Sequence, residues 1–364
     1  MLGLTRGCLL LTTATTMTSQ AYVHRGLSYT RRRHQRLFSS SSSSLVITQS
    51  NMIPRLETFQ QLISTYGCPG SSSTDWTPCD GSDKTNLHPL LLPLLSSSQD
   101  GERVISAVVT PYTTSKTPLP IVESFRGSRG LNLLSLNSEH LLRRIAATKD
   151  TEGVASAVND YNANLGSGLL PPELDNTYLA GDVDKLGYGV DKYLSLRVGP
   201  FPDVYYNLAL SHKETTTRLI AAEAANGKFG GWGGSFRRYG RLLEMTGDRA
   251  DEARDAVLVC FNLPLYTVGM DDADFLEIAR IAGIDGGFQG LRGFVDKLRE
   301  KENSDMMKGS QNSKSPQDAV LEKAGKLLDE TSLSDEFTWD SVRGELGALY
   351  REAGKNEVAS FVEC

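Results

Sequence analysis

Apolar residues recur at helical spacing along most of the chain beyond residue 137. Leu141, Leu142 and Ile145 fall on one side of a helix that Asn137 or Ser138 can cap. The same spacing predicts helices over residues 152–164, 183–196, 203–211, 214–226, 234–246, 249–262, 271–283, 286–301, 315–330 and 338–353. We therefore expect a mainly α-helical body, with a helical hairpin domain at 137–302 and C-terminal helices at 318–364. Between them, the polar, Ser/Lys-rich residues 303–317 predict a mobile loop.

Nearer the N-terminus the pattern changes to short β-branched runs. Residues 104–109 and 121–125 have the composition of strands, and a turn at 126–130 with two glycines separates the second run from the apolar residues 131–136. These features predict a small mixed α/β segment at 101–136 with a β-hairpin. Residues 57–66 predict a short amphipathic helix. The rest of 57–100 resembles a linker, with a flexible loop at 67–86 and irregular chain at 87–95 that Pro89 and Pro93 interrupt.

Two helix pairs within residues 203–264 have similar patterns. Tyr205 and Phe236 begin equivalent helices 31 residues apart, close to the period of about 34 residues in tetratricopeptide (TPR) repeats. In the second pair Gly240 and Ala253 occupy the small positions of that repeat, and Pro264 ends it. The expected architecture is therefore a set of antiparallel helical hairpins, TPR-like or α-solenoid-like.

Charge separates the first 56 residues from the rest of the chain. They contain seven arginines, no lysine, no acidic residue and a serine run at 39–44, whereas residues 57–364 hold 31 basic and 44 acidic residues, a net charge of −13. A basic, Ser/Arg-rich, acid-free leader is typical of an organelle import presequence. We interpret residues 1–56 as a disordered presequence that is cut after Ala21 and again within 38–56.

The leader is compatible with import into either of two organelles. A weakly apolar stretch at 7–21 precedes an Arg/Ser-rich segment that begins at Tyr22, which resembles the bipartite presequences of complex plastids, although their usual residue at that position is Phe. Residues 36–39 (RLFS) equally resemble a mitochondrial processing site. The plastid stroma is the expected location and the mitochondrial matrix the alternative. A tail without an address is the third possibility.

Composition and motifs exclude several classes of function. An acidic body repels phosphate backbones, so a nucleic-acid partner is not expected, and no segment beyond the leader is long and apolar enough to span a membrane. There is no C-x-x-C motif, no zinc-ligand spacing of Cys or His, and no G-x-S-x-G motif. A disulfide between Cys68 and Cys79 is a minor alternative to free thiols, and Asp271 to Asp274 fit an acidic helix N-terminus rather than a calcium loop. The sequence predicts no catalytic residue, metal or cofactor.

One glycine-rich stretch, residues 227–234, interrupts the helical pattern. A phosphate-binding P-loop requires Ser or Thr after its lysine, but Lys228 is followed by Phe229. We therefore expect a tight turn between helices. Its Trp232 ring is predicted to lie buried near Phe229, Phe236 and Tyr239.

Possible partner-binding residues gather around this turn. They are Arg237, Arg238, Arg241, Trp232 and Tyr205. The three arginines lie on one helix and form a local basic cluster suited to an acidic peptide or RNA. The competing interpretation is a solvated face whose arginines pair with nearby acidic residues, Glu244, Asp248 and Asp251.

A set of short motifs extends through residues 104–362. They include Val198-Gly-Pro-Phe-Pro202, Gly231-Trp-Gly-Gly-Ser-Phe236 with Tyr239, Glu252-Ala-Arg-Asp-Ala256, Leu263-Pro-Leu-Tyr-Thr-Val-Gly269, residues 319–329, and Tyr350-Arg-Glu-Ala-Gly354 with Phe361. Together they resemble a little-characterised family of plastid stromal proteins of land plants and algae. The family's usual tryptophan pair is Leu265-Tyr266 here. The resemblance implies a plastid address and transfers no reaction and no catalytic residues.

The leading functional hypothesis is a soluble organellar adaptor or assembly factor that binds a protein segment, because stacked hairpins form concave surfaces suited to extended partners. An enzyme with a pocket between the mixed segment and the helices is the alternative. RNA binding is a third possibility and requires the three arginines to be unpaired. The identity of the partner and the oligomeric state are left open.

Overall fold

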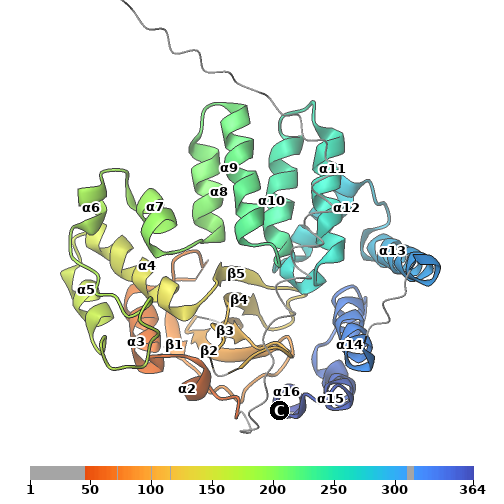
Figure 1. The fold of residues 1–364 in the computed structure, drawn as a ribbon, viewed down its shortest axis with the longest axis horizontal. Helices are drawn as coiled ribbons and strands as arrows, with labels where there is room; N and C mark the ends of the chain where they lie inside the picture. The colour runs from red at the N-terminus through yellow and green to blue at the C-terminus, as the bar shows by residue number, and fades with distance from the viewer. Residues whose placement is uncertain (1–45, 72, 100, 115, 310–314) are drawn as a thin grey trace, which may run out of the picture. The chain divides into compact units, whose positions relative to one another are not determined.

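The computed structural model describes residues 46–71, 73–99, 101–114, 116–309 and 315–364. Most of the expected presequence, with the cut after Ala21, lies outside these residues. The described part is mainly α-helical and contains one small antiparallel sheet near its N-terminal end (Figure 1).

Residues 46–56 are part of the folded body, which corrects their assignment to a disordered leader. Helix α2 (Gln49–Met52) is capped by the side chain of Thr48, and the side chains of Met52 and Ile53 are buried. Arg55 is also buried and forms an ion pair of 2.6 Å with Glu139. These contacts are long-range, so the local composition of the leader gives no sign of them.

The sheet is a five-stranded antiparallel meander in the order β1-β2-β3-β4-β5. Its strands are β1 (Trp76–Pro78), β2 (Leu91–Ser97), β3 (Arg103–Val108), β4 (Ile121–Phe125) and β5 (Asn132–Ser135). The predicted hairpin is confirmed as the antiparallel pair β4 and β5, with a register shift between Ile121 and Val122.

Two strands lie where irregular chain was expected. Strand β2 includes Pro93, and its pairing with β3 shifts register between Pro93 and Leu95. A bulge tolerates proline because the missing N–H is not needed in the ladder there, so the prediction of irregular chain was wrong. Strand β1 lies inside the expected flexible loop, where the side chains of Trp76 and Lys84 are buried.

Short helices flank the sheet on the side of its first strands. They are α3 (Leu56–Tyr66), α4 (Ser138–Thr151), α5 (Ala155–Asn162), α6 (Asp182–Leu186), α7 (Val190–Tyr193) and the π-helical turn η1 (Leu194–Val198). Asn137 caps α4 through the N–H of His140, as predicted. The single helix expected at 183–196 is instead divided, because Gly187 and Gly189 have positive φ angles of 75° and 78°.

The middle of the chain forms adjacent helices that lie side by side above the sheet in Figure 1. They are α8 (Pro202–Ser211), α9 (Thr215–Lys228), α10 (Gly233–Glu244), α11 (Ala250–Leu258), the 3-10 turns η2 (Val259–Asn262) and η3 (Leu265–Thr267), and α12 (Asp272–Ala282). Gly240 allows α10 to approach α11 closely, since a Cβ there would lie 2.6 Å from Val257 Cγ1. Asp271 and Asp274 form a capping box at α12, which confirms the acidic helix start.

The repeat interpretation stays a prediction, because equivalent aromatic residues pack in different places. Tyr205 packs against the core around the sheet, which also holds Phe229. Phe236 packs against a second core between α8, α9, α10, α11 and α12. The four helices form where the sequence predicts them. The two helix pairs differ in packing, however, because Tyr205 and Phe236 contact different cores.

The C-terminal part is helical and packs in part on the sheet core. Its elements are α13 (Gly287–Gly309), α14 (Pro316–Ser332), the 3-10 turn η4 (Asp340–Val342), α15 (Arg343–Glu352) and α16 (Asn356–Glu363). Helix α13 extends through the first half of the expected loop at 303–317, and residues 310–314 lie outside the described ranges. Trp339, Tyr350 and Phe361 join the core around the sheet, so the first and last segments of the described part share one hydrophobic core.

Candidate functional site

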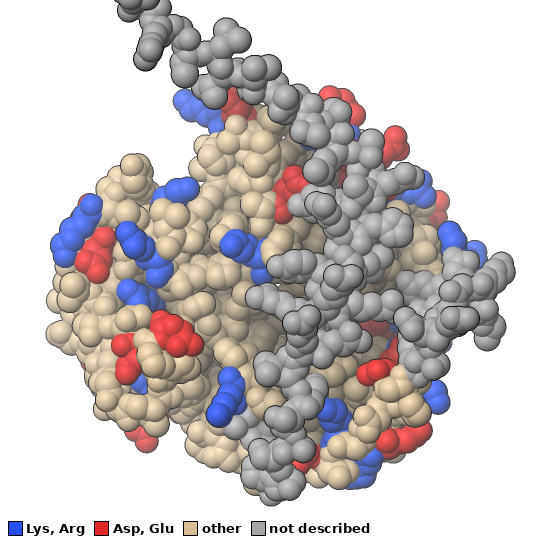
Figure 2. All heavy atoms as spheres, in the orientation of Figure 1, with Lys and Arg blue, Asp and Glu red and all other residues tan. Residues whose placement is uncertain are grey.

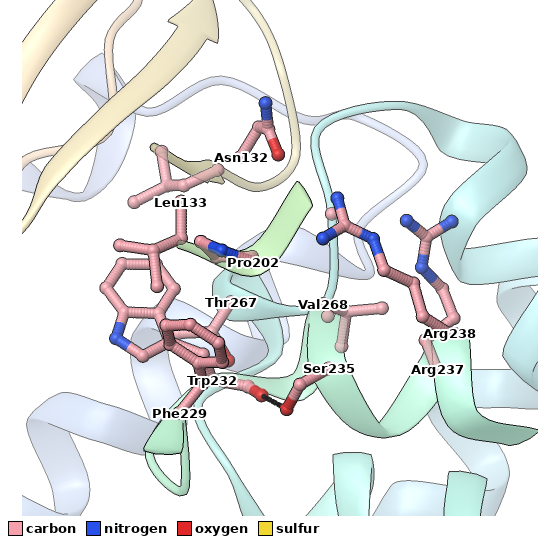
Figure 3. A pocket seen from close by; sticks show the side chains of 13 residues that line it. Asn132, Leu133, Pro202, Phe229, Trp232, Ser235, Arg237, Arg238, Thr267 and Val268 are labelled. Carbon is pink, nitrogen blue, oxygen red and sulfur yellow. Dashed lines mark hydrogen bonds between the residues drawn. The ribbon is translucent and has the colours of Figure 1, made fainter. Parts of the chain in front are cut away.

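A small hollow lies where β5, the starts of α8 and α10, and the end of η3 meet (Figure 3). We call it the α10 hollow. It is lined by Leu131, Asn132, Leu133, Pro202, Phe229, Trp232, Gly234, Ser235, Arg237, Arg238, Thr267, Val268 and Gly269. Its volume is about 20 Å³, which is room for about one water molecule. A small organic substrate cannot be enclosed there.

The apolar side of the hollow is formed by Trp232 and Phe229. Figure 3 shows both rings close to Leu133 and Pro202. Trp232 is partly buried against the core around the sheet, whereas Phe236 and Tyr239 belong to the core between the hairpins. The ring is therefore partly buried near Phe229, in part as predicted, while Phe236 and Tyr239 pack against the other core.

Tyr205 lies behind this apolar side rather than in the hollow itself. Its ring meets Phe229 edge to face, with centroids 5.9 Å apart. It is partly buried against the core around the sheet. The structure thus brings Tyr205 close to the turn that carries Trp232, as a packing neighbour of Phe229.

Two of the three arginines on α10 are held by helix α12. Arg237 forms ion pairs with Asp274 and, at 3.1 Å, with Glu277, and Arg241 forms an ion pair with Glu277. The prediction that these arginines pair with Glu244, Asp248 and Asp251 was wrong, because their partners are Asp274 and Glu277. Glu244 instead pairs with Arg280 at 2.5 Å. Helix α12 is more than thirty residues away in sequence, so no local spacing indicates these pairs.

Arg238 differs from its two neighbours. Among the described residues it forms no hydrogen bond or ion pair, and its guanidinium lies 5.8 Å from the centre of the Tyr206 ring. Burial lowers the pKa of Arg238 below its usual value, and the adjacent charge of Arg237 lowers this pKa further. In Figure 3 the guanidinium groups of Arg237 and Arg238 lie next to each other, away from Trp232 and Phe229.

The ion pair between Arg144 and Asp203 lies nearby and was not foreseen. Arg144 on α4 donates from both terminal nitrogens to the Asp203 carboxylate, with Nη1 2.8 Å from Oδ1. Asp203 lies in the first turn of α8, which begins at Pro202, one residue before the start expected from the sequence. The hydrogen bonds from Arg144 hold the pKa of Asp203 below its usual value even though burial acts to raise it.

The start of α10 adds hydrogen-bond donors to the hollow. The N-cap residue Trp232 supplies no side-chain cap, and the N–H of Gly233 donates to Thr267 Oγ1 at 3.0 Å. Within the described ranges, the N–H groups of Gly234 and Ser235 have no acceptor. Such first-turn N–H groups favour anions because they carry the positive end of the helix dipole.

A second, larger hollow lies beside the end of α12. Its volume is about 450 Å³, and its lining includes Arg254, Gly283, Phe294 and Lys297. It is an open groove along α13 rather than an enclosed cavity. None of the sequence-predicted partner-binding residues lines it.

The remaining chemistry-bearing groups of the described residues are held in structural positions. Cys68 and Cys79 are unpaired, and burial raises the pKa of both thiols, that of Cys79 to about 11. His88 is buried between the rings of Tyr266 and Trp339. In the same ranges, no group of three or more His, Cys, Asp or Glu side chains could hold a metal ion, and no helix has the length and apolar character needed to cross a membrane.

Charged side chains are mixed in sign on the part of the face in Figure 2 that grey residues leave visible. Exposed Lys and Arg atoms and exposed Asp and Glu atoms are scattered among uncharged surface there, rather than gathered into one large patch of a single sign. We therefore consider the three arginines of α10, Arg237, Arg238 and Arg241, as the candidate charged site.

Two domain families match this chain. Residues 202–285 match the PAB middle domain, and residues 292–364 match the PAB C-terminal domain. Neither a curated protein nor a solved structure matches the chain. The described part is thus a helical protein with a small antiparallel sheet, and its two matched regions follow that sheet in the sequence. The match to the PAB middle domain begins at α8 and includes Arg237, Arg238 and Arg241.

Proposed function

We propose that this protein is an organellar adaptor or assembly factor that binds a segment of another protein. The observation that carries the proposal is a stretch of exposed apolar side chains at residues 169–196. Leu169, Leu179, Tyr188 and Leu196 are 60%, 58%, 73% and 57% exposed. Four of the ten large apolar side chains that are exposed among the described residues lie in this stretch, and a partner that covers them would remove their apolar surface from water.

The form of this stretch suits a protein ligand. It contains only short helical elements, α6, α7 and η1, and η1 packs against α8 at the edge of the PAB middle domain. The stretch itself lies outside both PAB matches. A partner could therefore lie across the apolar stretch and reach the helices of the middle domain.

The hollows support binding over enclosed chemistry. The α10 hollow has room for about one water molecule, and the larger hollow is an open groove. Enzyme sites usually enclose most of a small ligand's surface. RNA binding receives no support from Arg237 and Arg241, because both are engaged by acidic residues of α12.

The proposed location is the plastid stroma, with the mitochondrial matrix as the alternative. The proposal rests on the acid-free, Arg/Ser-rich composition of the leader. A fluorescent fusion of residues 1–56 tests this location. Accumulation in plastids would support the stroma, whereas accumulation in mitochondria would favour the mitochondrial matrix instead.

Affinity purification from isolated organelles tests the adaptor role. We expect the wild-type chain to capture a specific protein, and the triple variant Leu179→Ser, Tyr188→Ser, Leu196→Ser to lose it. The matched control is Ile220→Ser, which removes an apolar side chain that is 62% exposed on α9. Equal capture by the wild type and the triple variant would refute the proposed surface, provided that both melt at the same temperature.

A further inference from the structure

Arg238 takes part in no ion pair among the described residues. The carboxylates around it are held by other arginines: Asp203 by Arg144, Asp274 by Arg237, and Glu277 by Arg237 and Arg241. Asp203 attracts Arg238 from beyond hydrogen-bond distance, and Asp191 on α7 interacts with Arg144 and Asp203. The charges of this region are therefore close to balanced, but the hydrogen-bond donors of Arg238 have no acceptor among the described residues.

Donors of hydrogen bonds converge next to this charge. Arg238 and Arg237 both line the α10 hollow, as does the amide side chain of Asn132. The Nε of Arg237 is buried and has no hydrogen-bond partner among the described residues, although its Nη1 is paired. A buried donor without an acceptor costs about 1–3 kcal/mol, so an acceptor that entered the hollow would remove this cost.

We propose that Arg238, together with the Arg237 Nε and the free first-turn N–H groups of α10, forms a seat for a carboxylate of an acidic segment of a partner protein. This inference rests on the proposed adaptor function. The hollow has room for about one oxygen atom of water size, which fits the tip of one Asp or Glu side chain. The planar guanidinium group matches carboxylate and phosphate oxygens in geometry, and a planar carboxylate can place a single oxygen in this small hollow.

A series of contacts connects the proposed carboxylate site with the apolar stretch at 169–196. The Tyr206 ring beneath Arg238 belongs to α8, and α8 packs against η1, which carries the exposed Leu196. A partner segment with an acidic residue beside apolar ones can engage both features. The acidic body repels long polyanions, which favours a single carboxylate over a nucleic-acid backbone.

Nuclear magnetic resonance of the full chain, observing the arginine Nε–Hε groups, tests the seat with N-acetyl-glutamate amide as the probe. We expect a saturable shift of the Arg238 resonance. Arg238→Gln should raise the Kd of the probe about tenfold or more, because a charge-assisted hydrogen-bond pair is lost. Arg292→Gln, which removes an exposed arginine on α13, should leave this Kd unchanged.

Two results would overturn the seat. One is a shift that sodium chloride reproduces at equal concentration, and the other is an unchanged Kd in Arg238→Gln. Inorganic phosphate serves as the second probe: if it binds more than about tenfold tighter than the capped glutamate, the assignment to a carboxylate is wrong.

Partner capture separates this inference from the proposed function. If the wild type captures a protein and Arg238→Gln reduces that capture while Arg292→Gln does not, the seat is the partner's anchor. If Arg238→Gln captures as much as the wild type, the carboxylate seat is not part of the interface. If the wild type captures nothing, the adaptor function fails, and the probe titration alone decides whether the anion seat exists.

Discussion

Trp232 joins helix α10 to the sheet. Its ring contacts the core around the sheet while its backbone forms the N-cap of α10. Glycines on both sides let the chain turn at this point, and Gly233 and Gly234 lie so close to Val268 that a Cβ would come within 3.0 and 3.2 Å of its atoms. Trp232 is thus one of the residues that connect α10 to the N-terminal sheet.

Replacing Trp232 by alanine should therefore destabilise the fold. Truncation of a buried aromatic residue costs about 3–5 kcal/mol, and the partial burial of this ring places the expected loss at or below the lower end of that range. Urea unfolding of Trp232→Ala and wild type measures the loss. A variant that unfolds like the wild type but no longer captures a partner would show that the ring is a binding anchor.

Arg55 provides a second test at the scale of one residue. It is buried, pairs with Glu139, and donates to the carbonyl oxygens of Tyr161 and Ala163 at 2.6 and 3.2 Å. Arg55→Met should lower the free energy of unfolding by about 3–5 kcal/mol, because it leaves the Glu139 carboxylate buried without its partner.

The double variant Arg55→Met, Glu139→Met is the matched control for this prediction. It removes both charges, so it should be less destabilised than Arg55→Met alone. Equal losses in the single and double variants would show that the ion pair is not the source of the effect. Chemical denaturation gives all three values.

At the scale of elements, helix α16 is tied to the loop before β2 by two basic side chains. Lys84 donates to the carbonyl oxygen of Phe361, and its ammonium lies over the Phe361 ring. Arg343 donates to the carbonyl oxygen of Val362 and also to that of Leu87. Lys84 is 277 residues away from Phe361 in sequence, and Arg343, 19 residues from Val362, also binds the loop that contains Lys84.

This attachment should depend on pH. Burial, together with the charge of Arg343, lowers the pKa of Lys84 to about 7, whereas an unfolded lysine titrates near 10.5. Above pH 7 the unfolded chain thus binds one more proton than the folded chain, so the free energy of unfolding should rise with pH. The slope from this group is at most about 1.4 kcal/mol per pH unit.

Denaturant unfolding of wild type and Lys84→Met between pH 7 and about 8.5 isolates this slope, because the thiols of the unfolded chain, which titrate near pH 8.5, contribute equally to both proteins. Lys84→Met, which keeps the apolar stem, should abolish the contribution. A variant with the same pH slope as the wild type would show that Lys84 keeps its usual pKa.

At the scale of the whole molecule, the folded body sets a limit on where the leader can be cut. Residues 49–55 include α2, and the Gln49 side chain donates to the carbonyl oxygen of Pro93 at 2.6 Å. Removal of Arg55 would break the buried pair with Glu139. We therefore expect the mature N-terminus at or before residue 48, in the first part of the window 38–56.

N-terminal sequencing of the protein from organelles checks this expectation. A mature chain that begins after Arg55 would contradict it. A chain that begins at Met1 would instead end the import hypothesis. Denaturant unfolding of chains that begin at residues 46 and 57 provides the matched comparison, and the shorter chain should be less stable.

The sequence alone was sufficient to predict an element when the residues that determine it all lie in one short segment. The stripe of Leu141, Leu142 and Ile145 predicts α4 and Asn137 its cap, because helix formation depends on residues within a few turns. The β4–β5 hairpin is equally local, as its turn at 126–130 joins neighbouring strands. The mainly helical class follows from many such segments.

The site depended on contacts that no local pattern contains. The pairing of Arg237 and Arg241 with α12, the isolation of Arg238, and the placement of Trp232 against the sheet all arise from segments that meet only in the folded chain. The same holds for Arg55 and β2, which composition alone assigned to a leader and to irregular chain. Local spacing therefore determined which helices form, whereas long-range packing decided which arginines of α10 form ion pairs and left Arg238 without one among the described residues.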